Sequence, residues 1–329
     1  MHYSLPLNPS LDQLRKQAKD LFTACKARNP EAVARIQGWH PAYPHNSTLN
    51  IDDGSFSLRD AQLVIARSHN FENWSRLKEY LSWDLAVLDQ DLEKMKSLLK
   101  AKPSRAQQKV MVFRRDASYW TMVSMHFADN SIPMVKLLLK YGATLDTPEE
   151  PVLSANSRPE FIDFVLEQGG SLENRYYNGT VLSLAAYAGN LETVGHYIRC
   201  GANVNSRSDP AGETPLHRAA FCSTTLRGHD PTQKTLDKTT FTEIIRLLIE
   251  AGADVNARTS ENVPSEMGPR LTVQGETPLH FAASCAEPEM IQLLLSSRAD
   301  KYAETALGKT PLDYAKKHQR SEDIIELLT

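Results

Sequence analysis

Histidine is the residue type whose placement in this chain most strongly suggests catalysis or metal binding. His217 and His280 each end a Gly-Glu-Thr-Pro-Leu-His phrase, which occurs at residues 212–217 and again at 275–280. In a third, related phrase an aspartate, Asp313, stands at the same position. Because the repeated phrase itself places histidine there, we interpret both histidines as structural residues that form hydrogen bonds within and between repeated units.

A second group of reactive side chains, Cys222, His229 and Asp230, is close together in the sequence. The chain has no C-x-x-C or H-E-x-x-H metal spacing, no glycine-rich phosphate loop and no G-x-S-x-G motif. The sequence therefore predicts no catalytic residue, no metal ligand and no cofactor, and we expect a protein that is not an enzyme. The alternative is an enzyme whose site is built by insertions in the chain.

The elements that position these residues begin at the threonine of each phrase. A threonine hydroxyl at a helix N-cap accepts a hydrogen bond from a free backbone N–H, and proline is favoured at the first helical position. A second phrase, at 247–256, ends an outer helix at a glycine, where a left-handed C-cap is favoured. The structural signature positions are Thr214, Pro215, His217, Gly252, Thr277, Pro278, His280 and Thr310.

The last two phrases repeat with a period of 33 residues, from Thr277 to Thr310 (310 − 277 = 33). This period, with a Thr-Pro-Leu-His-x-Ala phrase, resembles the ankyrin repeat, in which each unit is a β-turn and two helices. Less complete copies occur at 84–101, 134–146, 161–172 and 180–205. The resemblance implies an all-α ankyrin-repeat solenoid of helix-turn-helix repeats with β-turn or hairpin fingers, with about seven repeats over residues 83–329.

The repeat pattern has three departures. The phrases at Thr214 and Thr277 are 63 residues apart (277 − 214 = 63), which predicts insertions near 223–240 and near 259–275. Arg298 stands where other units have glycine, so we predict an altered helix cap there. The segment 109–115 alternates as a strand does, and we interpret it as a seal between the first two repeats or as a finger that reaches a partner.

Residues 1–82 lack the repeated phrase and are predicted to form a helical N-terminal domain. Apolar spacing and capping residues predict helices over 11–26, 31–36, 61–69 and 71–81. This segment resembles the helical leader of bacterial ankyrin-type proteins. The resemblance implies a bacterial origin, and we interpret the domain as a cap that covers the first repeat.

A DNA-linked regulator is the alternative for this N-terminal domain. Its residues 57–81 superficially resemble a helix-turn-helix, in which Arg67 and Arg76 would face DNA. The domain carries ten Lys and Arg against eight Asp and Glu, so its net charge of +2 does not favour a nucleic-acid surface.

The composition is that of an ordinary soluble globular protein, with 41% hydrophobic and 23% charged residues and a net charge of −3. No apolar run approaches the roughly 20 residues of a membrane span, and the start of the chain lacks the features of a signal peptide. Cys222 and Cys285 fall at equivalent repeat positions, too far apart for a disulfide, and should be free thiols. We expect a cytoplasmic protein, with export to a host as an effector left open.

The ankyrin resemblance also implies where a partner would bind, because inner helices and fingers line a concave face in such stacks. It points to positions seven and eight after each capping threonine and to the residue before it. The predicted partner-binding residues are Tyr176, Tyr177, Tyr187, Glu213, Phe221, Glu276, Ser284 and Lys309. Aromatic anchors with a charged rim are typical of a binding hot spot, so we expect a monomeric adaptor for another protein. The alternative, that Tyr187 and Phe221 pack under neighbouring loops, stays open.

Overall fold

The computed structural model describes residues 5, 9–43, 56–113, 119–123, 129–145, 151–176, 179–208, 210–221, 238–260, 263–264 and 271–329. Contacts within the chain form two compact units. The first comprises Met1–Phe127 with Lys136–Ala143, and the second comprises Ala128–Val135 with Thr144–Thr329. The domain boundary between residues 82 and 83 stays a prediction.

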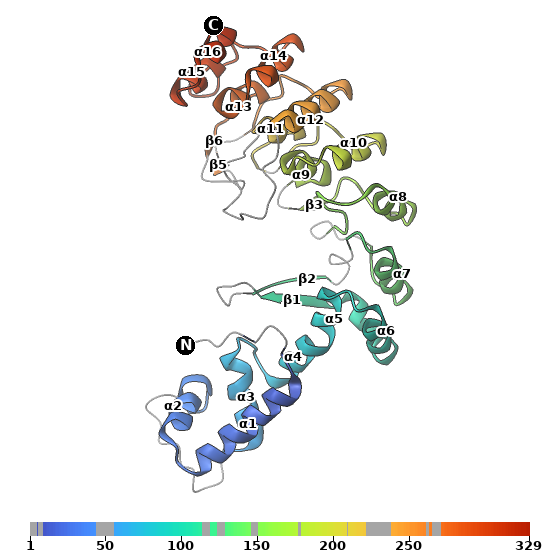
Figure 1. Ribbon diagram of the computed structural model, residues 1–329, viewed down its shortest axis with the longest axis vertical. Coiled ribbons are helices and arrows are strands. Elements are labelled where there is room, and N and C mark those ends of the chain that lie inside the picture. The colour runs from blue at the N-terminus through green and yellow to red at the C-terminus, as the bar shows by residue number, and fades with distance from the viewer. Residues whose placement is uncertain are drawn as a thin grey trace. The chain divides into compact units, whose positions relative to one another are not determined.

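The N-terminal part of the first unit is helical (Figure 1). Its helices are α1 (Leu11–Lys26), α2 (Pro30–Trp39), α3 (Leu58–Ser68), α4 (Trp74–Glu79), α5 (Leu85–Leu88) and α6 (Leu92–Ala101). Helix α1 packs on α3 and buries Leu14, Ala18, Leu21 and Cys25. These residues are three or four apart and therefore lie on one face of the helix. The helix predicted over 11–26 is confirmed.

One continuous helical segment replaces the separate helix that the sequence predicts over 71–81 and the start of the repeat copy predicted over 84–101. Helix α4, a π-helical turn at Tyr80–Asp84 and α5 follow one another without a break. No glycine or proline interrupts them, so the chain has no local reason to leave the helix. Asp84 is fully buried in this segment, and its carboxylate accepts a hydrogen bond from Arg76 Nη2 at 2.6 Å. Arg76 is therefore engaged in an ion pair within the unit.

An antiparallel hairpin follows α6 in the first unit. The elements after α6 are a 3-10 turn (Pro103–Gln107), β1 (Lys109–Phe113), β2 (Tyr119–Val123) and α7 (Ile132–Lys140). The hairpin register places Val110 opposite Met122. The strand character predicted from the alternating residues is thus confirmed over 109–113, and residues 114–115 lie outside the described part of the chain.

The second unit is built from two rows of short helices (Figure 1). Helices α9, α11, α13 and α15 pack in succession as the inner row, and α8, α10, α12, α14 and α16 form the outer row. The bounds are α8 (Pro159–Glu167), α9 (Val181–Ala188), α10 (Leu191–Arg199), α11 (Pro215–Ala220), α12 (Lys238–Glu250), α13 (Pro278–Cys285), α14 (Pro288–Ser296), α15 (Pro311–Lys317) and α16 (Glu322–Leu328). This is the all-α solenoid of helix pairs that the sequence predicts. None of the described helices has both the length and the apolar character needed to cross a membrane.

Local sequence explains where the inner helices begin. Thr214 and Thr310 have extended backbone, and each hydroxyl accepts a hydrogen bond from the N–H of the third helical residue. Proline follows each of them, and also Thr277, at the first helical position, where its missing N–H costs nothing. Short hairpins precede two inner helices: β3 (Arg175–Tyr176) with β4 (Gly179–Thr180), and β5 (Val263–Pro264) with β6 (Leu271–Thr272).

The two predicted insertions are described to different extents. The second, 259–275, contains the β5–β6 hairpin in its described parts. The first, 223–240, lies outside the described residues up to residue 237, and its last three residues belong to α12.

The helix cap at Arg298 is not altered, so that prediction was wrong. Arg298 adopts the left-handed backbone, with φ of 70°, as Gly252 does with φ of 90°. The closing hydrogen bonds are also retained: Arg298 N–H donates to the Leu295 carbonyl and Ala299 N–H to the Leu294 carbonyl, both at 3.0 Å. These bonds and the packing of the outer row hold the arginine in a conformation that costs about 1–2 kcal/mol for a side-chain-bearing residue.

The described cysteines are all free thiols: Cys25, Cys200 and Cys285. Cys25 is buried in the first unit, whereas the other two are half-buried in the second. Cys222, which the sequence pairs by position with Cys285, lies outside the described residues.

Candidate functional site

The two histidines of the repeated phrases link successive repeats. Both are fully buried, and each Nδ1 accepts a hydrogen bond from the backbone N–H of its capping threonine. Nε2 of His217 lies 3.1 Å from the Glu276 carbonyl, and Nε2 of His280 lies 3.0 Å from the Lys309 carbonyl. A backbone N–H only donates and a carbonyl only accepts, so both rings are neutral with the proton on Nε2. Each histidine therefore joins its own helix to the next finger.

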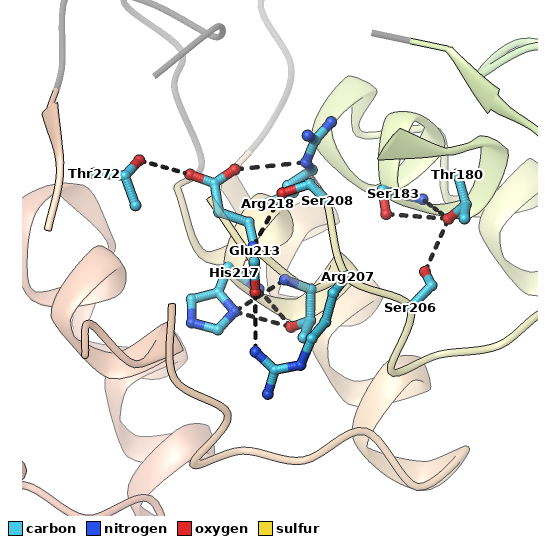
Figure 2. Close-up of polar contacts among 11 residues, drawn as sticks. Thr180, Ser183, Ser206, Arg207, Ser208, Glu213, His217, Arg218 and Thr272 are labelled. Carbon is cyan, nitrogen blue, oxygen red and sulfur yellow. Dashed lines mark hydrogen bonds and ion pairs between the residues drawn. The ribbon is translucent and has the colours of Figure 1, made fainter. Parts of the chain in front are cut away.

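A buried polar network surrounds Glu213 (Figure 2). Its carboxylate accepts a hydrogen bond from the Thr272 hydroxyl at 2.9 Å and lies 3.6 Å from Nε of Arg218. The backbone N–H of Glu213 donates to the Ser208 hydroxyl at 3.0 Å. The carboxylate and the guanidinium are both almost completely buried, so this pair holds the finger before α11 against β6 of the second insertion.

Glu276 occupies the corresponding place before α13 and is fully buried as well. Its carboxylate accepts a hydrogen bond from the Val273 N–H, and its backbone N–H donates to the Thr259 hydroxyl, both at 2.9 Å. The sequence places Glu213 and Glu276 on an exposed charged rim. The structure instead turns both carboxylates into the fingers, because the finger N–H and hydroxyl donors need acceptors there.

Two asparagines, each a few residues after one outer helix, form hydrogen bonds with the C-terminal cap of the next outer helix. The Asn205 amide donates to the Gly252 carbonyl at 3.0 Å and accepts from the Asp254 N–H at 2.8 Å. Asn256 makes the same two bonds one repeat later, to the Arg298 carbonyl at 3.0 Å and from the Asp300 N–H at 2.8 Å. The fingers are thus fixed from repeat to repeat by side-chain amides.

Arginines continue this ladder nearer the finger turns. Arg207 Nη1 donates to the Arg258 carbonyl at 2.7 Å, and Arg258 Nη1 donates to the Glu304 carbonyl at 2.8 Å. The backbone of successive fingers is also joined directly, because Ala306 N–H donates to the Gln274 carbonyl at 2.8 Å. The fingers therefore form a pre-organised row.

The predicted aromatic anchors Tyr187 and Phe221 lie at the C-terminal ends of α9 and α11, two inner helices in contact. Both are half-buried, as is Ser284, one inner helix further on, whose hydroxyl donates to the Phe281 carbonyl at 2.7 Å. The Phe221 ring meets the Phe281 ring edge to face, with 6.1 Å between centroids. Lys309 is exposed.

Three parts of the sequence hypotheses fall outside what the structure describes. They are Tyr177, the side chain of Tyr176, and the Cys222, His229 and Asp230 group. The enzyme alternative rests largely on the same insertion segments.

One finger exposes two large hydrophobic side chains that sequence reasoning missed. Tyr302 is 68% exposed and Leu307 is 64% exposed, both in the segment between α14 and α15. Leu307 directly precedes Gly308, at the finger position that Ala211 and Gln274 occupy in earlier repeats. A leucine at a turn position that is small or polar elsewhere was the available signal.

Family comparisons identify the repeated phrases. Residues 237–329 match a family model of ankyrin repeats in three copies, and residues 211–260 match a model of the single ankyrin repeat. Both matches lie in the second unit, where the inner and outer helix rows are most regular.

Several curated proteins resemble parts of this chain. The putative ankyrin repeat protein FPV031 of Fowlpox virus (strain NVSL) is 28% identical over 177 residues, which is 51% of this chain and 44% of that protein. Rabankyrin-5 of Mus musculus is 41% identical over 81 residues, 25% of this chain and 7% of its own length. Protein fem-1 homolog C of Danio rerio is 28% identical over 138 residues, 41% and 18% respectively. The chain thus matches less than half the length of each relative, and the bacterial origin stays a prediction.

Proposed function

This chain is an ankyrin repeat protein, and we propose that it is a non-enzymatic adaptor whose second unit binds another protein through its fingers and inner-helix ends. The observation that carries this proposal is the exposure of Tyr302 and Leu307 on a finger whose backbone is fixed. Burying such side chains against a partner is favourable, and aromatic anchors dominate protein interfaces.

The finger is suited to binding because its backbone is already ordered. Asp300 N–H donates to the Asn256 side chain and Ala306 N–H to the Gln274 carbonyl, each at 2.8 Å. Thr305 N–H donates to the Lys309 carbonyl at 3.0 Å and closes the finger turn. A partner that docks here therefore loses little entropy in ordering the loop, so more of the burial energy appears as affinity.

The inner-helix ends extend the proposed face. Tyr187, Phe221 and Ser284 occupy equivalent positions on successive inner helices, and the exposed Lys309 adds a cationic edge. Tyr176, in β3, and Tyr177, which follows it in the sequence, remain part of the hypothesis. Glu213 and Glu276 are left out of the proposed face, because burial makes both carboxylates unavailable to a partner.

We propose a monomer in a reducing, cytoplasmic compartment, and the free thiols of Cys25, Cys200 and Cys285 support a reducing one. The contacts of two arginines do not favour a DNA-linked role. Of the two arginines that would face DNA, Arg76 binds the buried Asp84 and Arg67 Nε lies 3.4 Å from the Glu72 carbonyl.

The test compares three double variants of the full chain in pull-down with quantitative mass spectrometry. The finger variant Tyr302→Ala/Leu307→Ala should lose one partner captured by the wild type, with stability changed by no more than about 0.5 kcal/mol. The inner-helix variant Tyr187→Ala/Phe221→Ala should weaken the same partner. The matched control Gln292→Ala/Ser296→Ala, on the exposed face of α14, should capture it fully. Undiminished capture by the finger variant would refute the proposed face.

A further inference from the structure

Three side chains of metal-binding type meet on the outer helices of the second unit. Asp163 comes from α8, His196 from α10, and Cys200 directly follows α10. His196 and Cys200 are four residues apart, so a helix presents them on one face. One ligand atom from each of the three residues lies within 4.8 Å of the other two.

One of the distances between these atoms is close to that of a tetrahedral zinc site. With Zn–N and Zn–O of about 2.1 Å and Zn–S of about 2.3 Å, tetrahedral geometry places N and O about 3.4 Å apart and S and O about 3.6 Å apart. Cys200 Sγ lies 3.8 Å from Asp163 Oδ1, and His196 Nε2 lies 2.7 Å from the same oxygen. Of these two pairs, the second must open for an ion to fit between its atoms. The Asp163 side chain is 55% exposed and can rotate to do so.

We propose that Asp163, His196 and Cys200 bind a zinc ion, with a fourth coordination position left to solvent. A thiolate, a carboxylate and a neutral imidazole carry a combined charge of −2, which a divalent cation neutralises. The sulfur ligand selects zinc over magnesium and calcium, which prefer oxygen ligands only. On binding, the Cys200 proton leaves to solvent and the imidazole proton moves from Nε2 to Nδ1.

A redox or nucleophilic role for Cys200 fits the surroundings less well. Burial, together with the nearby Asp163 carboxylate, raises the pKa of the Cys200 thiol. A thiol that stays protonated is a weak nucleophile, whereas a reactive cysteine needs an environment that lowers its pKa.

Arg199 determines which ring nitrogen of His196 carries the proton when no metal is bound. Its Nη2 lies 3.2 Å from His196 Nδ1, so it donates to that nitrogen and keeps the ring proton on Nε2, facing Asp163. Zinc at Nε2 requires the proton on Nδ1, where an arginine offers no acceptor. Metal-binding histidines usually donate this proton to a carboxylate or carbonyl. Arg199 therefore opposes metal binding, and a glutamate in its place would favour it.

The first experiment titrates the full chain with Co²⁺, a spectroscopic substitute for Zn²⁺, and then displaces it with Zn²⁺. We expect a thiolate-to-cobalt charge-transfer band that saturates at one equivalent, disappears in Cys200→Ser and persists in Cys285→Ser and Cys222→Ser. Asp163→Asn and His196→Gln should each weaken Zn²⁺ binding by more than about 100-fold, beyond the usual effect of losing an outer partner of a ligand. No band in the wild type, or a band that survives Cys200→Ser, would overturn the site.

A second pair of variants tests the geometry. Arg199→Glu should tighten Zn²⁺ binding by about tenfold relative to Arg246→Glu, which makes the same charge change on α12, a helix that carries none of the three ligands. Equal affinities in the two variants would overturn the role given to His196. A measurement without variants guards against misfolding: Zn²⁺ should protect Cys200, but not the similarly buried Cys285, from alkylation by iodoacetamide. Equal labelling of both cysteines with and without Zn²⁺ would count against the site.

Discussion

The repeats at 212–310 and the earlier repeat at 180–206 join their neighbours through different chemistry. In the later repeats a buried imidazole spans the gap, from the N-cap of its own helix to a carbonyl of the next finger. In the earlier repeat Ser183 stands in place of the histidine, and the capping Thr180 itself lies 2.9 Å from the Ser206 hydroxyl. The earlier repeat is therefore still linked to the next finger, through hydroxyl groups and not through an imidazole.

The difference follows from the length of the side chain at this position. A serine side chain is too short to cap its own helix and also contact the next finger, so the finger supplies a hydroxyl of its own. The last repeat shows a third solution. Asp313 accepts hydrogen bonds from the N–H and the hydroxyl of Thr310 at 2.9 and 3.0 Å, which keeps the cap. Capping is thus a local requirement, whereas the link between repeats can be formed by side chains from either repeat.

Breaking the histidine link should have the largest effect. His217→Ala removes a buried ring that contacts the edge of Phe281 at 5.2 Å between centroids and makes two backbone hydrogen bonds. We expect a loss of about 2–3 kcal/mol in the free energy of unfolding, from the lost bonds and the cavity. Urea denaturation measures it, with the exposed His318→Ala expected within about 0.5 kcal/mol of the wild type. A loss below about 1 kcal/mol would mean that the imidazole link contributes little.

Breaking the hydroxyl link should cost less. Ser206→Ala removes one buried hydrogen bond, while Thr180 keeps its contact with Ser183 at 3.1 Å. We expect a loss of about 1 kcal/mol, measured in the same denaturation experiment. Ser296→Ala is the control, because its hydroxyl bonds only to the Leu293 carbonyl of its own helix on an exposed surface. If Ser206→Ala lowers the free energy of unfolding as much as His217→Ala does, the two links contribute equally, which would contradict the expected difference between them.

The smallest effect concerns the pH dependence of the aspartate cap. Hydrogen bonds from the Thr310 backbone, then from its hydroxyl, lower the pKa of Asp313. A folded-state pKa below the unfolded one stabilises the protein above the unfolded value, and this contribution is lost as pH falls through the folded value. Asp313→Asn keeps an acceptor without titrating. The Tm advantage of wild type over this variant should therefore shrink between about pH 5 and about pH 3. A constant difference across that interval would show that the aspartate charge does not stabilise the cap.

Local sequence patterns predict much of the fold. Thr214, Thr277 and Thr310, each followed by proline, predicted the starts of inner helices, and Gly252 predicted the end of an outer one. These features depend on a few neighbouring residues, so composition and spacing are enough to recognise them. The left-handed cap at Arg298 is not predicted from the sequence, because a rule applied residue by residue counts only the local cost of that backbone conformation. The hydrogen bonds and packing that hold the arginine left-handed come from the whole repeat.

The repeat, the starts of its inner helices and the family follow from the amino-acid sequence, because each depends on short-range capping and periodic apolar residues. Which side chains face solvent depends on the packing of the folded chain. It buried Glu213 and Glu276 among finger donors and left Tyr302 and Leu307 exposed. It also brought Asp163, 33 residues away in sequence, to within 2.7 Å of His196. The burial of a side chain and its contacts with other repeats depend on how successive repeats stack. That stacking is determined by residues far apart in the chain.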